Sequence, residues 1–382
     1  MTIAFVFTNP RHHLDMMAPV AAELERRGHR CEILSLAELR GFDTPAGIRR
    51  AIPLQLRRRD STAPSKKRNT WSRGRVAQHV AWQVLRLRMR QLLREAEVVV
   101  IPNDAVFPYT ELAADLHARM IPTVLLQEGI RFPLPDSYDG PGYGASGNAC
   151  VCAWGDGSRD YFVANHVPAG IVAVTGAPRL DELDPERWRA PAAELIAEHA
   201  LPSRPIAFLS NPIEIQGYGP KQLKLDMFAR FLDEIASTVR AQNIPIIVKN
   251  HNHEDPAEFS RVAAGTAIAE HVHVIPTGSV FAAIAASRAA VVLTSTVGLE
   301  ALMFGVPLGV LEIPGHDFAF DYVQRGAAVP LRFGSLRAGV DELLADRPER
   351  RTIATAFVAR HLHDRGRARY NVAHAIEGVL HG

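Results

Sequence analysis

Hydroxyl residues that could hold an anion follow an apolar run in the last third of the chain. Residues 289–293 are apolar and predict a buried strand, which ends in three hydroxyl residues: Thr294, Ser295 and Thr296. A helix then begins, and the free backbone N–H groups at such a helix start attract anions such as phosphate. Gly298 would let the anion approach the backbone, and Glu300 could accept hydrogen bonds from a ribose or sugar hydroxyl. The alternative is an ordinary Ser/Thr-rich helix cap.

The loops after the other apolar runs of the second half carry similar side chains. They contain amide, hydroxyl and basic groups and almost no acids, and their candidate anion-binding residues are Asn211, Lys249, His251, Pro276 and Thr277. A lysine charge and hydroxyl donors stabilise the negative charge of a departing phosphate. The second half of the chain is therefore predicted to bind an anion.

Carboxylates occur in the corresponding loops of the first half. Glu128 follows the apolar residues 123–126 and precedes Gly129, which permits a tight turn. A carboxylate there could take the proton from an attacking hydroxyl, and Asp104, after the apolar run at 98–101, is the second candidate for this role. The side chains predicted to contact such an acceptor are His12, His13, Gln127 and Arg131. Alternatively, Glu128 pairs with Arg131 or caps a turn, and the two histidines lie on the surface.

Metal-ligating residue types stand close together at His251, His253, Glu254 and Asp255. No further ligand with suitable spacing accompanies them, and Asp255 followed by proline is an ordinary helix start. The chain also contains no Asp-x-Asp sequence, which could bridge a metal ion to a diphosphate. We therefore expect neither a metal site nor a cofactor.

An alternating α/β framework is needed to position these loops. Apolar strand-like runs alternate with segments of helical spacing in both halves of the chain. The pattern predicts an α/β fold of two doubly wound Rossmann-like domains whose strand ends face a cleft. The predicted parts are a first Rossmann-like domain at 1–175 with a basic insertion at 49–94, a proline-rich linker at 176–204, a second, anion-binding Rossmann-like domain at 205–360 and a C-terminal helix at 361–382. In that last stretch we expect His361 and His363 to be solvated.

Charge is distributed unevenly along the chain. The net charge of the 382 residues is only +2, yet residues 49–94 contain 14 Lys/Arg and a single acid, Asp60. Such a segment is typical either of a solvated surface or of attraction to anionic lipid. No nucleic-acid-binding motif occurs, so we expect no nucleic-acid partner. No apolar run is long enough to span a membrane and the N-terminus lacks a signal-peptide pattern. We therefore expect a cytoplasmic protein, with contact at the inner face of the membrane as the alternative.

Three stretches carry a resemblance to a known superfamily. They are residues 174–183 (Val-Thr-Gly-Ala-Pro-Arg-Leu-Asp-Glu-Leu), 248–251 (Val-Lys-Asn-His) and 294–307 (Thr-Ser-Thr-Val-Gly-Leu-Glu-Ala-Leu-Met-Phe-Gly-Val-Pro). The chain resembles GT-B glycosyltransferases of bacterial surface-carbohydrate synthesis. The strings are similar to those of capsule Kdo transferases, CDP-glycerol glycerophosphotransferases and UDP-N-acetylglucosamine 2-epimerases. Where these relatives commonly have Lys-Pro-His-Pro, this chain has Lys-Asn-His-Asn at 249–252.

The resemblance implies a metal-independent glycosyltransferase. It would move a sugar from a CMP-, CDP- or UDP-linked donor to a cell-surface glycan or lipid-linked acceptor. Lys249 and His251 would meet the phosphates or the sugar acid group of the donor, the hydroxyls at 294–296 would hold phosphate, and Glu300 would bind the ribose. The first domain would bind the acceptor, the second would bind the nucleotide-sugar, and the C-terminal helix would return to the first domain. The alternatives are an epimerase-like enzyme, a CDP-glycerol-type glycerophosphotransferase and a binding protein without catalytic activity.

Overall fold

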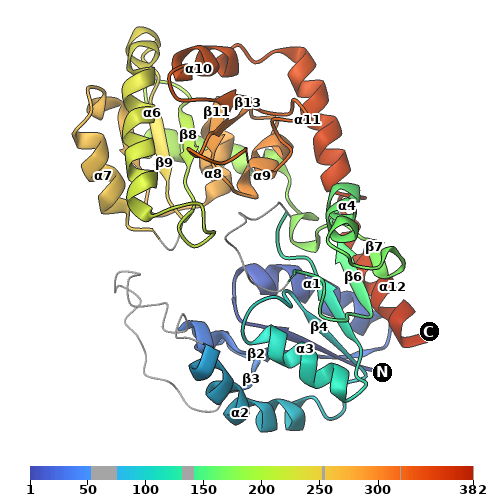
Figure 1. Cartoon of the computed structure of the whole chain (residues 1–382). Coiled ribbons are helices and arrows are strands. Elements are labelled where there is room, and N and C mark those ends of the chain that lie inside the picture. Colours follow the sequence, from blue (N-terminus) through green and yellow to red (C-terminus); the bar gives the residue numbers. More distant parts are fainter. Residues whose placement is uncertain (53–74, 131–141, 252–253, 319, 382) are drawn as a thin grey trace. The chain divides into compact units, whose positions relative to one another are not determined.

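The chain folds into two compact units (Figure 1). The computed structural model describes residues 1–52, 75–130, 142–251, 254–318 and 320–381. Of the described residues, 1–52, 75–130, 142–183 and 360–381 form the first unit, and 184–251, 254–318 and 320–359 form the second. Several residues named above lie outside the described part of the chain, namely Arg131, His253 and the basic stretch around residues 57–68.

A parallel sheet forms the centre of the first unit. Its strands are β1 (Thr2–Phe7), β2 (Arg30–Ser35), β3 (Arg49–Arg50), β4 (Val98–Ile101), β5 (Thr123–Leu126), β6 (Cys150–Ala153) and β7 (Val172–Val174). Their order across the sheet is β3-β2-β1-β4-β5-β6-β7. The chain thus winds outward in both directions from the neighbouring strands β1 and β4. A crevice forms at the carboxyl ends of strands at such a switch point, and ligands commonly bind there.

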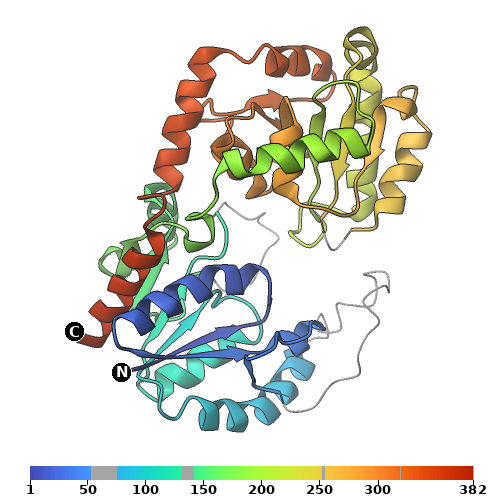
Figure 2. The ribbon, with the colours of Figure 1, turned by 180° about the vertical axis from the view of Figure 1, so that it is seen from behind.

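Helices cover both faces of this sheet. They are α1 (His12–Arg26), α2 (Arg75–Leu92), α3 (Tyr109–Ala118), α4 (Asp156–Ala164) and α12 (Ala368–His381), with short 3-10 turns at Ala37–Arg40, Ala169–Ile171 and Pro178–Leu180. Alternate residues of β1 enter different cores, because successive strand side chains point to opposite faces. Ile3 and Phe5 pack with residues of α1 and α12, which Figure 2 shows on one face. Ala4 and Val6 pack with residues of α2 and α3 on the other face.

The second unit repeats this plan. Its strands are β8 (Ile206–Leu209), β9 (Ile246–Lys249), β10 (Val272–Val274), β11 (Ala289–Val292), β12 (Leu308–Leu311) and β13 (Val329–Leu331). They are parallel, in the order β10-β9-β8-β11-β12-β13, so the switch point lies between β8 and β11. The helices are α5 (Arg189–Glu198), α6 (Lys221–Gln242), α7 (Pro256–Ala264), α8 (Val280–Ala286), α9 (Val297–Met303), α10 (Leu336–Leu344) and α11 (Pro348–His361), with 3-10 turns at Pro185–Trp188 and Ala269–His271.

The predicted doubly wound α/β architecture is confirmed by the two parallel sheets. The interval 176–204, which was predicted to be a linker, is divided between the units at Leu183. Helix α5 within this interval packs against α8 of the second unit, and the rings of Trp188 and Phe281 lie 5.3 Å apart. None of the described helices combines the length and the apolar character needed to cross a membrane.

The C-terminal segment packs on the first unit through two glycines. The segment that follows α11 donates a hydrogen bond from His363 N to Trp154 O at 2.8 Å. The expectation that His361 is solvated is wrong, since this residue is only 4% exposed. A Cβ added to Gly157 would lie 2.3 Å from Cε1 of His361, and one added to Gly155 would lie 2.4 Å from Arg360 O. The close approach of the segment to α4 therefore requires glycine at both positions.

Replacing Gly157 with alanine should destabilise the first unit. The added methyl group overlaps the His361 ring, and such overpacking costs about 1–3 kcal/mol despite the better helix propensity of alanine. Gly378→Ala in α12 is the matched control, since nothing lies within 4 Å of its added Cβ. The control should be neutral or slightly stabilising in urea unfolding. In a His361→Ala background the cost of Gly157→Ala should largely disappear, and an undiminished cost there would contradict this contact.

Candidate functional site

The strongest candidate site of the first unit lies at its switch point. Glu128 follows β5, Asn103 follows β4 and His13 lies in the first turn of α1, after β1. One oxygen of the Glu128 carboxylate accepts a hydrogen bond from Asn103 Nδ2 at 2.6 Å. The other oxygen lies 2.9 Å from His13 Nε2, and the Glu128 side chain remains 25% exposed. Both neighbours present donors, so the site complements a carboxylate that solvent or a ligand can still reach.

The backbone around His13 fixes the orientation of its ring. The amides of Thr8 and Asn9 donate to its Nδ1 at 3.4 and 3.2 Å, so Nδ1 is an acceptor and the ring proton sits on Nε2. The hydroxyl of Tyr109 lies 3.4 Å from the same nitrogen. Asn9 also stabilises the turn that leads into α1, because its Oδ1 accepts from the backbone amides of residues 11 and 12. His13 can consequently donate to Glu128 in only one arrangement.

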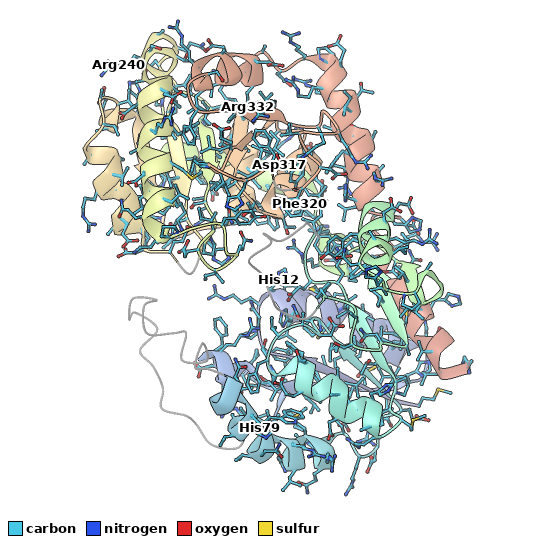
Figure 3. All side chains as sticks on the ribbon, viewed as in Figure 1. His12, His79, Arg240, Asp317, Phe320 and Arg332 are labelled. Atoms are coloured by element: carbon cyan, nitrogen blue, oxygen red, sulfur yellow. The ribbon has the colours of Figure 1, made fainter. Side chains whose placement is uncertain are left out.

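His12 lies beside this pair and points its Nε2 at the backbone carbonyl of Glu128, 2.5 Å away. Figure 3 shows the residue at the N-terminal end of α1. Burial first, and the positive charge of Arg179 second, lower the pKa of His12 to about 4. The ring is therefore uncharged at neutral pH, and its Nε2 carries the proton that the carbonyl accepts.

Arg179 is a site residue that was not predicted from the sequence by itself. It belongs to the 3-10 turn Pro178–Leu180, and its guanidinium lies 5.5 Å from the ring centroid of Trp154. Its charge acts on His12 and on Asp15, a carboxylate of the same helix. Burial raises the pKa of Asp15, and Arg179 opposes that shift. Residues 174–183, which carry the resemblance, therefore place the positive charge of Arg179 near the strand ends where Glu128 lies.

Two other predicted site residues of the first unit, Asp104 and Gln127, are buried and bonded to neighbouring loops. Asp104 is fully buried, and its carboxylate accepts from Gly144 N at 2.8 Å, Ser146 N at 3.2 Å and Asn148 Nδ2 at 2.8 Å. Gln127 is also fully buried, with its amide group bonded to Gly129 O, Ser158 Oγ and Trp154 N, each at 2.8 Å. These contacts hold neighbouring loops together, which favours structural roles over proton abstraction by Asp104 and acceptor contact by Gln127.

Asn211 and Thr294 join the two strand ends at the switch point of the second unit. Asn211 Nδ2 donates to Thr294 Oγ1 at 2.6 Å, and Thr294 N donates to Asn211 Oδ1 at 3.2 Å. Gln216 completes the network by bonding to both side chains. Because Asn211 and Thr294 are 4% and 2% exposed, their polar groups are committed to connecting the loops after β8 and β11. Both residues therefore shape the edge without offering free groups to a ligand.

The start of α9 has one feature that the sequence did not reveal. Ser295 and Thr296 are partly exposed, as an anion contact requires. However, a Cβ on Gly298 would lie 3.1 Å from Tyr322 Oη and 3.2 Å from Leu308 Cδ2, so the space beside this glycine holds side chains rather than open volume. This packing already favours a glycine at position 298, and the role of Gly298 in anion approach stays a prediction. Glu300 is only 4% exposed, and its charge contributes to raising the pKa of the buried Tyr322, for which burial is the main cause.

Lys249 occupies the end of β9 beside the loop that follows β10. Its Nζ donates to Thr277 O at 2.7 Å and to Ile275 O at 3.3 Å, and burial lowers the pKa of this amine. Pro276, Thr277 and His251 are exposed around it. A partly desolvated cation next to exposed hydroxyl and imidazole groups is suited to binding an anion.

A buried ion pair that the sequence did not reveal supports the loop carrying His251. Lys224 on α6 is 2% exposed and donates to Glu254, and also to Glu214 Oε2 at 3.1 Å. The Glu254 carboxylate also accepts from Ser210 Oγ at 2.9 Å and His251 N at 2.7 Å. Asp255 caps α7 by accepting from the amide of residue 257. The described residues contain no cluster of three or more His, Cys, Asp or Glu side chains suited to a metal ion.

Replacing Lys224 with methionine should destabilise the second unit strongly. Removing one partner leaves Glu254 buried without its cation, and such losses amount to about 3–5 kcal/mol. Lys221→Met is the matched control, because the 39% exposed Lys221 side chain pairs with Glu258 near the surface and should cost less than about 1 kcal/mol. Urea unfolding of both variants measures the difference. Equal losses would show that the Lys224 pair does not hold this loop.

Comparisons with known proteins identify the fold. No protein-family model and no curated protein matches the sequence. Among solved structures, the UDP complex of MnaA from S. aureus aligns with 100% of this chain and 97% of its own, at 13% identity and a TM-score of 0.68. A UDP-GlcNAc 2-epimerase from Neisseria meningitidis bound to UDP-GlcNAc aligns over 99% and 100%, at 13% identity and 0.63.

A third solved structure widens the range of activities found on this fold. WaaG, a glycosyltransferase involved in lipopolysaccharide biosynthesis, aligns over 98% of this chain and 100% of its own, at 15% identity and a TM-score of 0.54. The chain therefore has the GT-B-type fold, which the expected resemblance named and which these epimerases and glycosyltransferases share. At such low identity the likeness defines the fold, and function has to be argued from the site.

Proposed function

We propose that the protein is a nucleotide-sugar-dependent glycosyltransferase that acts on a cell-surface glycan or a lipid-linked acceptor. The observation that carries this proposal is the Glu128 carboxylate, which lies at the switch point, remains partly exposed and accepts hydrogen bonds from His13 and Asn103. A general base must be positioned, reachable and able to accept a proton, and Glu128 meets these requirements.

The proposed reaction is a substitution at the anomeric carbon of the donor sugar. The acceptor hydroxyl oxygen forms the new bond, the bond from the anomeric carbon to the phosphate oxygen breaks, and the electron pair leaves with the nucleotide. Glu128 takes the hydroxyl proton. His13 donates to the carboxylate throughout and holds it in one orientation. Arg179 and the neutral His12 are two further polar groups at this edge that could contact the acceptor.

Leaving-group stabilisation is assigned to the second unit. Lys249 supplies a positive charge, and His251, Thr277, Ser295 and Thr296 present exposed or partly exposed polar groups at the carboxyl edge of the sheet. These groups would bind the phosphates of a CMP-, CDP- or UDP-linked donor through charge-assisted hydrogen bonds. Since the chain contains no Asp-x-Asp sequence, we propose that transfer does not require a metal ion.

Nucleotide-sugar epimerisation is the second candidate function. Its support is that the N. meningitidis epimerase aligns with a higher TM-score, 0.63, than the transferase WaaG, 0.54. An epimerase needs several carboxylates around the sugar for proton abstraction and elimination. Of the two carboxylates predicted as bases, Glu128 remains reachable, whereas Asp104 is buried and bonded to three donors. Transfer needs one such base, so we favour it over epimerisation.

Substitution of Glu128 by glutamine tests the proposed base. A thermal-shift panel of CMP-, CDP-, UDP- and GDP-sugars first identifies the donor, since a ligand of the native state raises the unfolding temperature. Turnover is then followed as nucleotide release with a bacterial glycolipid extract as acceptor and EDTA present. Glu128→Gln should retain donor binding while transfer falls by about a hundredfold or more. Glu25→Gln, an exposed carboxylate near the opposite end of α1, is the control and should retain activity.

Other results of this experiment would reassign the function. Near-normal turnover in Glu128→Gln would move the base to another residue of this edge. Loss of all turnover in EDTA, restored by a divalent cation, would contradict metal independence. Formation of an epimer from UDP-N-acetylglucosamine without acceptor would establish the epimerase alternative. A panel in which no nucleotide-sugar shifts the unfolding temperature would contradict the proposal itself.

A further inference from the structure

Helix α2 of the first unit carries apolar residues on two opposite faces. The inner face contributes Trp82, Leu85 and Met89 to the core, where they are 6%, 7% and 1% exposed. This face accounts for the attachment of α2 to the sheet. An amphipathic helix of a globular protein would carry polar residues on its other side.

The outer face of α2 instead presents an exposed aliphatic row. Val80, Val84 and Leu87 are 60%, 77% and 73% exposed. Their spacing of i, i+4 and i+7 places them in line on one side of the helix. They make up three of the nine large hydrophobic side chains that are exposed in the described part of the chain. Isolated exposed hydrophobic residues are ordinary, but three in one row indicate a contact surface.

Positive charge surrounds this row. Between residues 75 and 94 the sequence has five arginines and no acid. Arg86 and Arg90 both pair with Asp115 of α3. Within the described part of the chain, the guanidinium of Arg88 donates to the neutral side chain of Gln91. Arg94 pairs with the adjacent, exposed Glu95. The partner of this face should therefore combine an apolar interior with an anionic surface.

We propose that the Val80–Val84–Leu87 face of α2 docks the protein onto an anionic lipid bilayer. The three aliphatic side chains would enter the boundary between head groups and acyl chains, while Arg88 and Arg94 meet lipid phosphates. The sequence supports this occupant, since residues 49–94 hold 14 cations against one acid. Docking here is independent of the proposed transfer reaction, although it would suit a lipid-linked acceptor.

A second copy of the chain fits this face poorly. A two-fold contact through α2 would place the same arginines of both copies close together, where their charges repel. Three aliphatic side chains also form a small apolar core compared with the roughly 800 Å² per partner of a stable protein interface. A bilayer fits this face better, because it supplies an apolar phase for the aliphatic side chains and negative charge for the arginines.

Vesicle co-sedimentation of the full chain tests the docking face. Phosphatidylcholine vesicles with and without phosphatidylglycerol are compared, and the decisive variant is Val80→Gln/Val84→Gln/Leu87→Gln. Wild-type protein should bind the anionic vesicles, and the triple variant should bind about tenfold less or weaker still. The matched control is Met120→Gln, which alters a side chain that is 88% exposed elsewhere in the same unit and should leave binding unchanged. Arg88→Gln/Arg94→Gln should reduce the preference for phosphatidylglycerol.

Hydrogen exchange of the wild-type protein gives a readout that does not depend on the variants folding. Anionic vesicles should slow exchange of residues 78–92, whereas phosphatidylcholine vesicles should have little effect. Wild-type protein that fails to bind anionic vesicles, or a folded triple variant that binds them as wild type does, would overturn the proposal. Sedimentation showing a wild-type dimer that the triple variant converts to monomer would assign the face to a second copy and overturn it as well.

Discussion

The hydrogen bond between His13 and Glu128 is the interaction on which the proposed chemistry depends. It connects the first turn of α1 to the end of β5, and Asn103 between them adds a bond from the end of β4. Three neighbouring strand ends thereby determine the position of one carboxylate. Because the amides of Thr8 and Asn9 occupy Nδ1, the His13 ring cannot turn over without losing these bonds. The fold supplies a carboxylate whose orientation is set before any ligand binds, which reduces the entropic cost of reaction.

Polar residues at the strand ends fall into two groups in both units. Asp104, Gln127, Asn211 and Thr294 are buried and bond to neighbouring loops, so they maintain the shape of the edge. Glu128, Lys249, His251, Ser295 and Thr296 retain exposure. The first group satisfies hydrogen-bonding groups that would otherwise be costly to bury. Of the two groups, only the second is exposed enough to contact a substrate.

The sequence predicted the fold better than the site. Alternation of apolar runs and helical spacing is a local property, and it was sufficient to predict two doubly wound sheets. It also placed Glu128 just after a strand and Lys249 at the end of one, where parallel sheets present their loops. Which polar residues are used internally depends on partners far away in sequence, such as Gln216 for Thr294 and Asn148 for Asp104.

Long-range packing explains the other differences from the expectations. The packing of Tyr322 and Leu308 against Gly298 was not predicted, because neither residue belongs to the same segment of the sequence. The burial of Lys224 beside Glu254 was not predicted, because the two residues lie 30 positions apart in the sequence. His361 stands in a polar stretch, and the return of the C-terminal segment to α4 buries it. Arg179 lies within residues 174–183, which carry the resemblance, but its proximity to His12 follows from the fold alone.

The state of the His13 ring is the most direct test of this account. Nitrogen NMR of ¹⁵N-histidine-labelled protein near neutral pH distinguishes the two neutral tautomers and the imidazolium, and a His13→Asn variant assigns the signals. The geometry predicts a ring protonated at Nε2, with Nδ1 in the chemical-shift range of a hydrogen-bonded acceptor. A proton on Nδ1, in either the other tautomer or the imidazolium, would contradict the arrangement that holds Glu128 in place.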